Sequence, residues 1–153
     1  MAKNNKRVKT GQQKPKKTAT FINNPDSYND QTPVWSFSIC DFEHGKWGIC
    51  RCVKEALKTE KIWKRLQTLE TRTWREIKSD PSPSHRNSQN HEIEIHRLTK
   101  DAQKRLKQLN KDDYDSLFSL HIDNFVRVFG IREGRVFNIL WFDLDHSVCP
   151  VRK

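Results

Sequence analysis

Three β-rich runs near the end of the chain decide the fold: "SLFSLHI" (residues 116–122), "FVRVFGI" (125–131) and "RVFNILWF" (135–142). They are short, rich in β-branched and aromatic side chains and bounded by turn residues, which is typical of strands. Asp123 and Asn124 separate the first two runs. "REG" (132–134) joins the second pair, with Gly134 where a positive φ would be needed. Connections this short predict an antiparallel meander.

The first half of the folded region predicts a strand followed by helix. "VWSFSICDF" (34–42) alternates apolar and polar residues, which indicates a half-buried strand, and "WGICRC" (47–52) is a weaker candidate for a returning strand. From Val53 to Ile77, apolar residues recur mostly at steps of three and four, as on one face of one helix or two consecutive helices. Thr71 or Thr73 could cap the second of these, and Trp63 and Trp74 are expected core anchors.

The middle of the chain predicts a loop, a strand and a helix. "SDPSPSHRNSQN" (79–90) has no apolar side chain and indicates a surface loop, and "HEIEIHR" (91–97) alternates like a strand. Thr99 is well placed to cap a helix over "KDAQKRLKQL" (100–109). We therefore predict one α+β domain over residues 34–153. Its antiparallel sheet comprises the C-terminal three-strand meander plus an N-terminal strand, packed against two or three helices.

The formal net charge of +10 is concentrated near the N-terminus. Residues 1–18 contain no acid and seven basic residues: Lys3, Lys6, Arg7, Lys9, Lys14, Lys16 and Lys17. Residues 1–33 are predicted to be a basic disordered tail and linker, and a tail of this kind gains affinity for nucleic acid by counterion release. The alternative is a solubilising extension with no partner.

Targeting, membrane and metal signals are weak. The tail lacks the apolar region of a secretory signal, and no run of about 18 apolar residues is present, so we expect a cytoplasmic protein that does not contact membranes. Cys40, Cys50, Cys52 and Cys149 are then expected to be reduced. The first three, with His44, do not have a recognised zinc spacing, and we expect no metal and no cofactor.

Polar side chains follow the last predicted strand in "WFDLDHSVCPVRK" (141–153). Asp143 and His146 are three residues apart, close enough for a carboxylate to orient an imidazole. They could also bind a metal, if His91 or His121 joined them. Alternatively, Asp143 caps a turn and His146 is exposed. Cys149 is a weak candidate nucleophile, because nothing places a base beside it.

A charged residue also interrupts the second run of the meander. Arg127 lies between Val126 and Val128, and a guanidinium in such a place either pairs with a carboxylate or binds a phosphate. Arg132 and Arg135 flank the following turn, and the three arginines together could line a phosphate-binding face. The histidines of "HEIEIH" are five residues apart in a predicted strand, which excludes a zincin-type helix motif.

The order of a strand, a helix pair and antiparallel strands with an embedded Arg127 and a late His146 resembles the RelE/ParE superfamily of toxin components. Some members of that superfamily are ribosome-dependent ribonucleases. The resemblance spans residues 34–150 and is most detailed over 116–149. The chain also resembles small bacterial proteins that end in a Trp-rich strand followed by D-x-x-H-x-V-C-P. Unlike typical toxins of the group, this chain is longer and lacks a terminal tyrosine.

The resemblance implies a metal-independent ribonuclease that cleaves mRNA, with RNA or the ribosome as partner and an antitoxin protein as a further possible partner. In that interpretation His146 is the acid or base, Arg127 stabilises the phosphate, Asp143 orients the imidazole, and His91 is a reserve for the second proton transfer. The competing hypotheses are a noncatalytic binding module for nucleic acid or protein that uses the basic tail, and a metal-dependent nuclease built on Asp143 and His146.

Overall fold

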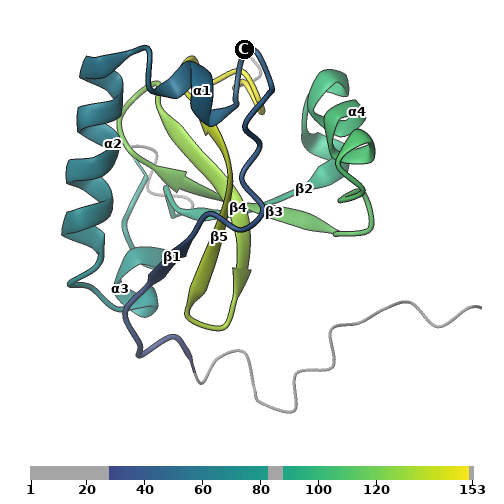
Figure 1. Ribbon diagram of the computed structural model, residues 1–153. Helices are drawn as coiled ribbons and strands as arrows, with labels where there is room; N and C mark the ends of the chain where they lie inside the picture. The colour runs from purple at the N-terminus through teal and green to yellow at the C-terminus, as the bar shows by residue number, and fades with distance from the viewer. Residues whose placement is uncertain (1–27, 83–87, 152–153) are drawn as a thin grey trace, which may run out of the picture.

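The computed structural model describes residues 28–82 and 88–151, which form a five-stranded sheet with helices on both faces (Figure 1). The strand order is β1-β5-β4-β3-β2. The strands are β1 (Val34–Ser36), β2 (His91–Glu94), β3 (Ser116–His121), β4 (Arg127–Glu133) and β5 (Val136–Asp143). β1 pairs in parallel with β5, and all other pairs are antiparallel. The predicted α+β class and the C-terminal meander are confirmed.

Four α-helices lie in the described ranges, and the 3-10 helix η2 (Ile95–Arg97) follows β2. They are α1 (Ile49–Cys52), α2 (Ala56–Leu69), α3 (Trp74–Lys78) and α4 (Lys100–Gln108). Figure 1 shows α2 and α3 on one side of the sheet and α4 on the other. None of these helices is long and apolar enough to cross a membrane.

The face under α2 and α3 is the larger core. The apolar residues predicted at helical spacing are all buried here: Ile62, Leu66, Leu69, Trp74 and Ile77. Thr73 caps α3 through a capping box with Glu76, which fixes the break between the two helices. Trp63 was wrongly predicted to be a core anchor, because 39% of it is exposed. Its ring lies at the border of this core, edge-on to Phe142 and tilted against Phe37.

The face under α4 holds a second core. Ala102 and Leu106 of α4 pack there with Trp47, Trp141 and Val148. The predicted cap is confirmed, since the Thr99 hydroxyl accepts a hydrogen bond from the backbone N–H of Ala102. Helices cover both faces of the sheet, so β5 is buried on both sides. Its sequence is accordingly a nearly continuous apolar run.

A β-bulge changes the direction of the side chains near the end of β5. Phe129 pairs with Trp141 and Gly130 with Ile139, so Leu140 is an extra residue. Leu140 and Trp141 consequently both face the α4 core, whereas strict alternation would turn Trp141 and Asp143 toward α2. The bulge therefore places Asp143 on the α4 side of the sheet.

Three of the predicted strands differ from the structure. "WGICRC" forms α1 and the turn before it, because Trp47 is buried against the α4 face and Gly48 accepts the first helical hydrogen bond from Cys52. "HEIEIHR" is a strand only as far as Glu94, where η2 begins. The strand predicted from Val34 ends at Ser36, and a turn from Phe37 to Cys40 follows.

Residues 28–33, the last part of the predicted tail and linker, contact the domain. Asn29 is buried, and its carbonyl accepts from the backbone N–H of Arg75, while Gln31 accepts from Trp74. The folded region thus begins before the predicted boundary at Val34. All seven basic residues of the predicted tail lie outside the described residues.

Candidate functional site

Three polar residues form a row across the middle strands at one end of the sheet. In the pairing register, His121 of β3 lies opposite Arg127 of β4, which lies opposite Asp143 of β5. Residues directly opposite one another in antiparallel strands share a face. The row therefore lies on the α4 side, beside the β3–β4 loop and the C-terminal turn. His146 follows in that turn, three residues after Asp143.

Asp143 serves the C-terminal turn rather than an imidazole. Its side chain is fully buried, and Oδ2 accepts from the backbone N–H of Val148 at 2.8 Å. Oδ1 accepts from the backbone N–H of Ser147 at 2.9 Å and from the Ser147 hydroxyl at 3.2 Å. Within the described ranges it makes no hydrogen bond to His146. The predicted role as orienter of His146 is therefore corrected, and the turn-capping alternative describes Asp143 better.

Arg127 keeps part of its guanidinium uncommitted. Nη1 donates to the backbone carbonyls of Asp123 and Val126, the latter at 3.0 Å. Within residues 28–82 and 88–151, Nε and Nη2 donate no hydrogen bond and no carboxylate lies at ion-pair distance. Burial lowers the pKa of Arg127, against the opposing effect of the Asp143 and Asp123 carboxylates. A half-buried cation with free donors is suited to binding an anion.

His146 lies near enough to Arg127 for the arginine's charge to act on it. The side chain is half-buried, and its backbone has a φ of 54°, a left-handed conformation uncommon in residues other than glycine. Burial lowers the pKa of His146, the positive charge of Arg127 lowers it further, and the Asp143 carboxylate partly opposes both. The imidazole is therefore neutral at pH 7 and able to accept a proton.

His121 belongs to the same site, although the sequence suggested it only as a possible metal partner. Burial and the charges of Arg127 and Arg65 lower its pKa to about 4. Its backbone N–H donates to the side chain of Asn90 at 2.8 Å, which ties this end of β3 to the residue before β2. The signal in the sequence was the spacing around the tight β3–β4 turn, which places residues 121 and 127 opposite each other.

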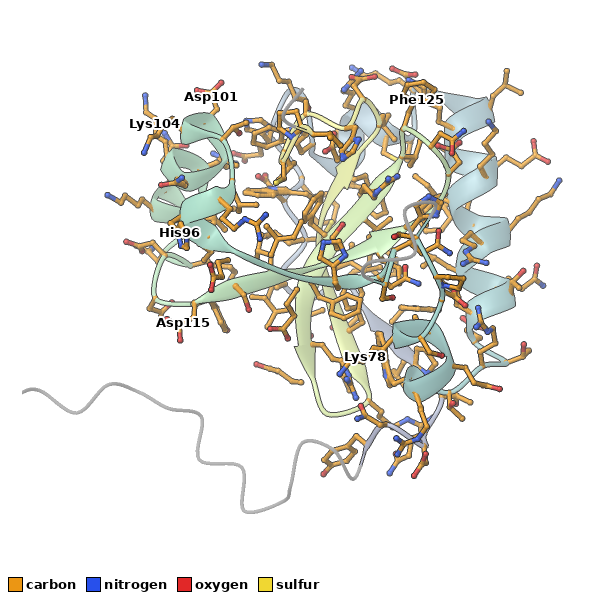
Figure 2. All side chains as sticks on the ribbon, turned by 180° about the vertical axis from the view of Figure 1, so that it is seen from behind. Lys78, His96, Asp101, Lys104, Asp115 and Phe125 are labelled. Atoms are coloured by element: carbon orange, nitrogen blue, oxygen red, sulfur yellow. The ribbon has the colours of Figure 1, made fainter. Side chains whose placement is uncertain are left out.

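Phe125 is a further residue that sequence reasoning missed. It lies in the β3–β4 loop two residues before Arg127, and 68% of it is exposed (Figure 2). An exposed aromatic ring is a platform on which a nucleic-acid base can stack. Its place in an apolar run had suggested only a strand residue.

His91 is not among these groups. It lies exposed on the edge strand β2, opposite Ser119, and its Nδ1 is 2.8 Å from the carbonyl of Ser88. Two strand spacings separate it from β4, or about 10 Å across the sheet. The structure thus brings together Arg127, Asp143 and His146 and leaves His91 aside.

Arg132 and Arg135 lie at the opposite end of β4 from Arg127. Arg132 stacks over the ring of Trp74 at 4.6 Å and donates to Asn29 and to the carbonyl of Gly134. Arg135 donates to Thr32. Both hold residues 28–33 against the domain. The predicted phosphate-binding face of three arginines is wrong, because the strand separates Arg127 from the other two.

The cysteine and histidine grouping of residues 40–52 has structural contacts. The His44 ring stacks on Trp47 with centroids 4.4 Å apart, and its Nδ1 accepts from the backbone N–H groups of Lys46 and Trp47. Cys52 is buried beside Thr59. In the part of the chain that the structure describes, no three side chains of His, Cys, Asp or Glu are grouped to hold a metal ion.

Asp41 anchors another polar group that the sequence did not reveal. Its carboxylate accepts two hydrogen bonds from Arg105, both at 2.8 Å, and one from the Trp141 indole at 3.1 Å. Burial alone would raise the pKa of Asp41, but these bonds and the backbone N–H of His44 lower it to about 2. The pair connects α4 to the sheet and leaves no oxygen free for a ligand.

Comparisons of the chain with protein-family models, with curated proteins and with solved structures gave no match. The resemblance to the RelE/ParE superfamily therefore stays a prediction. The chemistry of the site itself is a cation with free donors beside two neutral imidazoles, and the adjoining β3–β4 loop carries an exposed aromatic ring. This combination can hold a phosphate and accept a proton from a group beside it.

Proposed function

We propose that the protein is a metal-independent endoribonuclease that cleaves RNA at the His121–Arg127–His146 site, in the manner of RelE-like toxins. The uncommitted guanidinium of Arg127 carries this proposal, since it is half-buried, lacks a carboxylate partner among the described residues and lies beside two neutral imidazoles. Burying a cation in this way costs stability unless an anion offsets it.

The proposed reaction uses the 2′-hydroxyl of the RNA as nucleophile. Neutral His146 takes the 2′-hydroxyl proton, the 2′-oxygen attacks the adjacent phosphorus, and Arg127 stabilises the charge that accumulates on the phosphoryl oxygens. The bond from phosphorus to the 5′-oxygen then breaks, and the products are a 2′,3′-cyclic phosphate and a 5′-hydroxyl. DNA has no 2′-hydroxyl and is not a substrate in this scheme.

His121 is better placed than His91 to return a proton to the leaving 5′-oxygen, because it lies directly opposite Arg127. With a pKa of about 4, His121 is unprotonated near pH 7 in the free protein and has no proton to donate there. A bound phosphate raises that pKa by placing a negative charge beside the imidazole. Phe125 would stack the base next to the scissile bond.

The test is cleavage of an end-labelled RNA in the presence of a chelator, both free and on translating ribosomes in a cell-free extract. Arg127→Ala and His146→Asn should each lower the rate by about a hundredfold or more. Asparagine is chosen because it tolerates the left-handed backbone of residue 146. His96→Asn is the matched control, since His96 is exposed on η2 away from the site and should leave the rate unchanged.

Two outcomes would contradict the proposal. One is intact RNA at excess wild-type protein in both settings. The other is cleavage that Arg127→Ala and His146→Asn leave untouched while both variants keep the wild-type unfolding midpoint. Loss of cleavage on adding a chelator would instead favour the metal-dependent hypothesis. Binding without cleavage that depended on residues 1–18 would favour the binding module.

A further inference from the structure

The outer face of α4 carries a row of three lysines. Lys100, Lys104 and Lys107 follow one another at steps of four and three, which places them within an arc of about 60° on the helix. Ala102 and Leu106 of the same helix are buried in the core, so the lysine row points away from the sheet. In Figure 2, Lys104 and Asp101 lie on the outer side of α4.

The lysines of α2 have a different environment. Lys58 pairs with Glu55 and Asp145, Lys61 with Asp123, and Lys64 with Glu60. In the described part of the chain, by contrast, Lys100, Lys104 and Lys107 form no ion pair with any carboxylate. The two helices are similar in lysine content but differ in whether the charge is neutralised within the protein.

The lysine row opposes the stability of its own helix. Like charges at steps of three and four repel one another, and Lys100 occupies the first helical position, where the helix dipole favours an acid. Asp101 in the first turn offsets only part of this. An external anion along the row would relieve both effects.

A lysine from another element extends the row into a shallow hollow of about 310 Å³. Lys46, from the turn before α1, lines it together with Lys104, and His44, Gln108 and one acid, Asp101, also belong to the wall. Arg105 also lines the hollow but is already bound to Asp41. Two exposed lysines from separate elements thus converge on a space large enough for a phosphate group.

We infer that the lysine row of α4 and this hollow form a docking surface for the phosphodiester backbone of RNA. The choice of RNA rests on the proposed function. The surface and the His121–Arg127–Asp143 row lie on the same side of the sheet. Lysine contacts to phosphates supply affinity without reading sequence.

The test measures binding separately from cleavage. A short labelled 2′-O-methyl RNA cannot undergo the proposed reaction, and its affinity for the full chain is followed by fluorescence anisotropy over a salt series. Lys100→Gln, Lys104→Gln and Lys107→Gln combined should weaken binding about tenfold or more and reduce the salt slope by about 2.

The matched control carries the same change in net charge on the other side of the sheet. It combines Lys54→Gln, Lys64→Gln and Lys78→Gln, all exposed residues on or beside α2 and α3, and should change the affinity less than about twofold. Urea unfolding of both triple variants checks that they fold. If the α4 triple variant does not fold, Lys104→Glu alone takes its place and should also weaken binding.

Equal losses in the two triple variants would overturn the inference, because affinity would then follow net charge rather than the α4 surface. So would undiminished binding by the α4 variant, or tighter wild-type binding to duplex DNA than to RNA. Selective loss in the α4 variant together with no cleavage of ordinary RNA would support the surface and sink the proposed ribonuclease.

Discussion

Replacing Asp143 with alanine should detach the C-terminal turn from the sheet. The carboxylate is the acceptor for the backbone N–H groups of Ser147 and Val148, at 2.9 and 2.8 Å, and it lies in the protein interior. Val148 is itself fully buried beneath α4. The variant must therefore either bury two unpaired N–H groups or release the turn and expose Val148.

The two routes set the size of the effect. A buried donor left without its acceptor costs about 1–3 kcal/mol, and the bonds lost here are to a charged group. Exposing a buried valine costs about 1.5–3 kcal/mol. The protein takes the less costly route, which is release of the turn, so we expect Asp143→Ala to lower the free energy of unfolding by about 1.5–3 kcal/mol.

Urea unfolding followed by tryptophan fluorescence measures this loss, because Trp47 and Trp141 lie in the same core as Val148. With a typical urea dependence, the midpoint should fall by about 1–2 M. Asp145→Ala is the control, since the Asp145 side chain is 48% exposed and pairs with Arg51 and Lys58 at the surface. Such pairs contribute about 0–1 kcal/mol. Equal midpoints for the two variants would refute the assignment of Asp143 to the turn.

Three other perturbations give checks of the same kind. Arg127→Met should raise the pKa of both His121 and His146, because it removes a positive charge that disfavours the imidazolium, and NMR titration of the ring protons would show it. The pKa of Asp41 is about 2 in the folded protein and near 3.8 in the unfolded chain, so its ionised carboxylate stabilises the folded state at pH values above about 4. This contribution should be lost as the pH drops from about 4 to 2. Arg105→Ala should make that loss smaller when unfolding midpoints are measured against pH. Gly130→Ala should destabilise the domain by several kcal/mol in urea unfolding, since the added Cβ would lie 2.3 Å from the carbonyl oxygen of Asn138.

The sequence was most informative where one local pattern determines the outcome. Helical spacing predicted the buried face of α2 and α3, and hydroxyl side chains predicted the caps at Thr73 and Thr99. Gly134 adopts the expected positive φ of 63° in the turn between β4 and β5. These features depend on residues within a few positions of one another, so alternation and capping chemistry are sufficient to find them.

Long-range partners decided the features that the sequence did not reveal. Trp47 is buried because α4 and the C-terminal turn cover it, and Asp41 is ionised because Arg105, 64 residues away, reaches it. Likewise, Arg132 had the same appearance in sequence as Arg127, yet it stacks on Trp74. Local pattern cannot distinguish a guanidinium with an aromatic partner from one whose donors remain free.

The bulge at Leu140 connects these two kinds of information. Without the extra residue, strict alternation along β5 would turn Asp143 toward α2. No carboxylate of β5 would then lie opposite Arg127 on the α4 side. With it, Asp143 faces the same side as Arg127 but gives both oxygens to the C-terminal turn. The C-terminal turn holds His146 in its left-handed conformation near the guanidinium of Arg127. A structural carboxylate therefore positions the candidate site without taking part in its chemistry, and this explains why Arg127 retains free donors beside a buried acid.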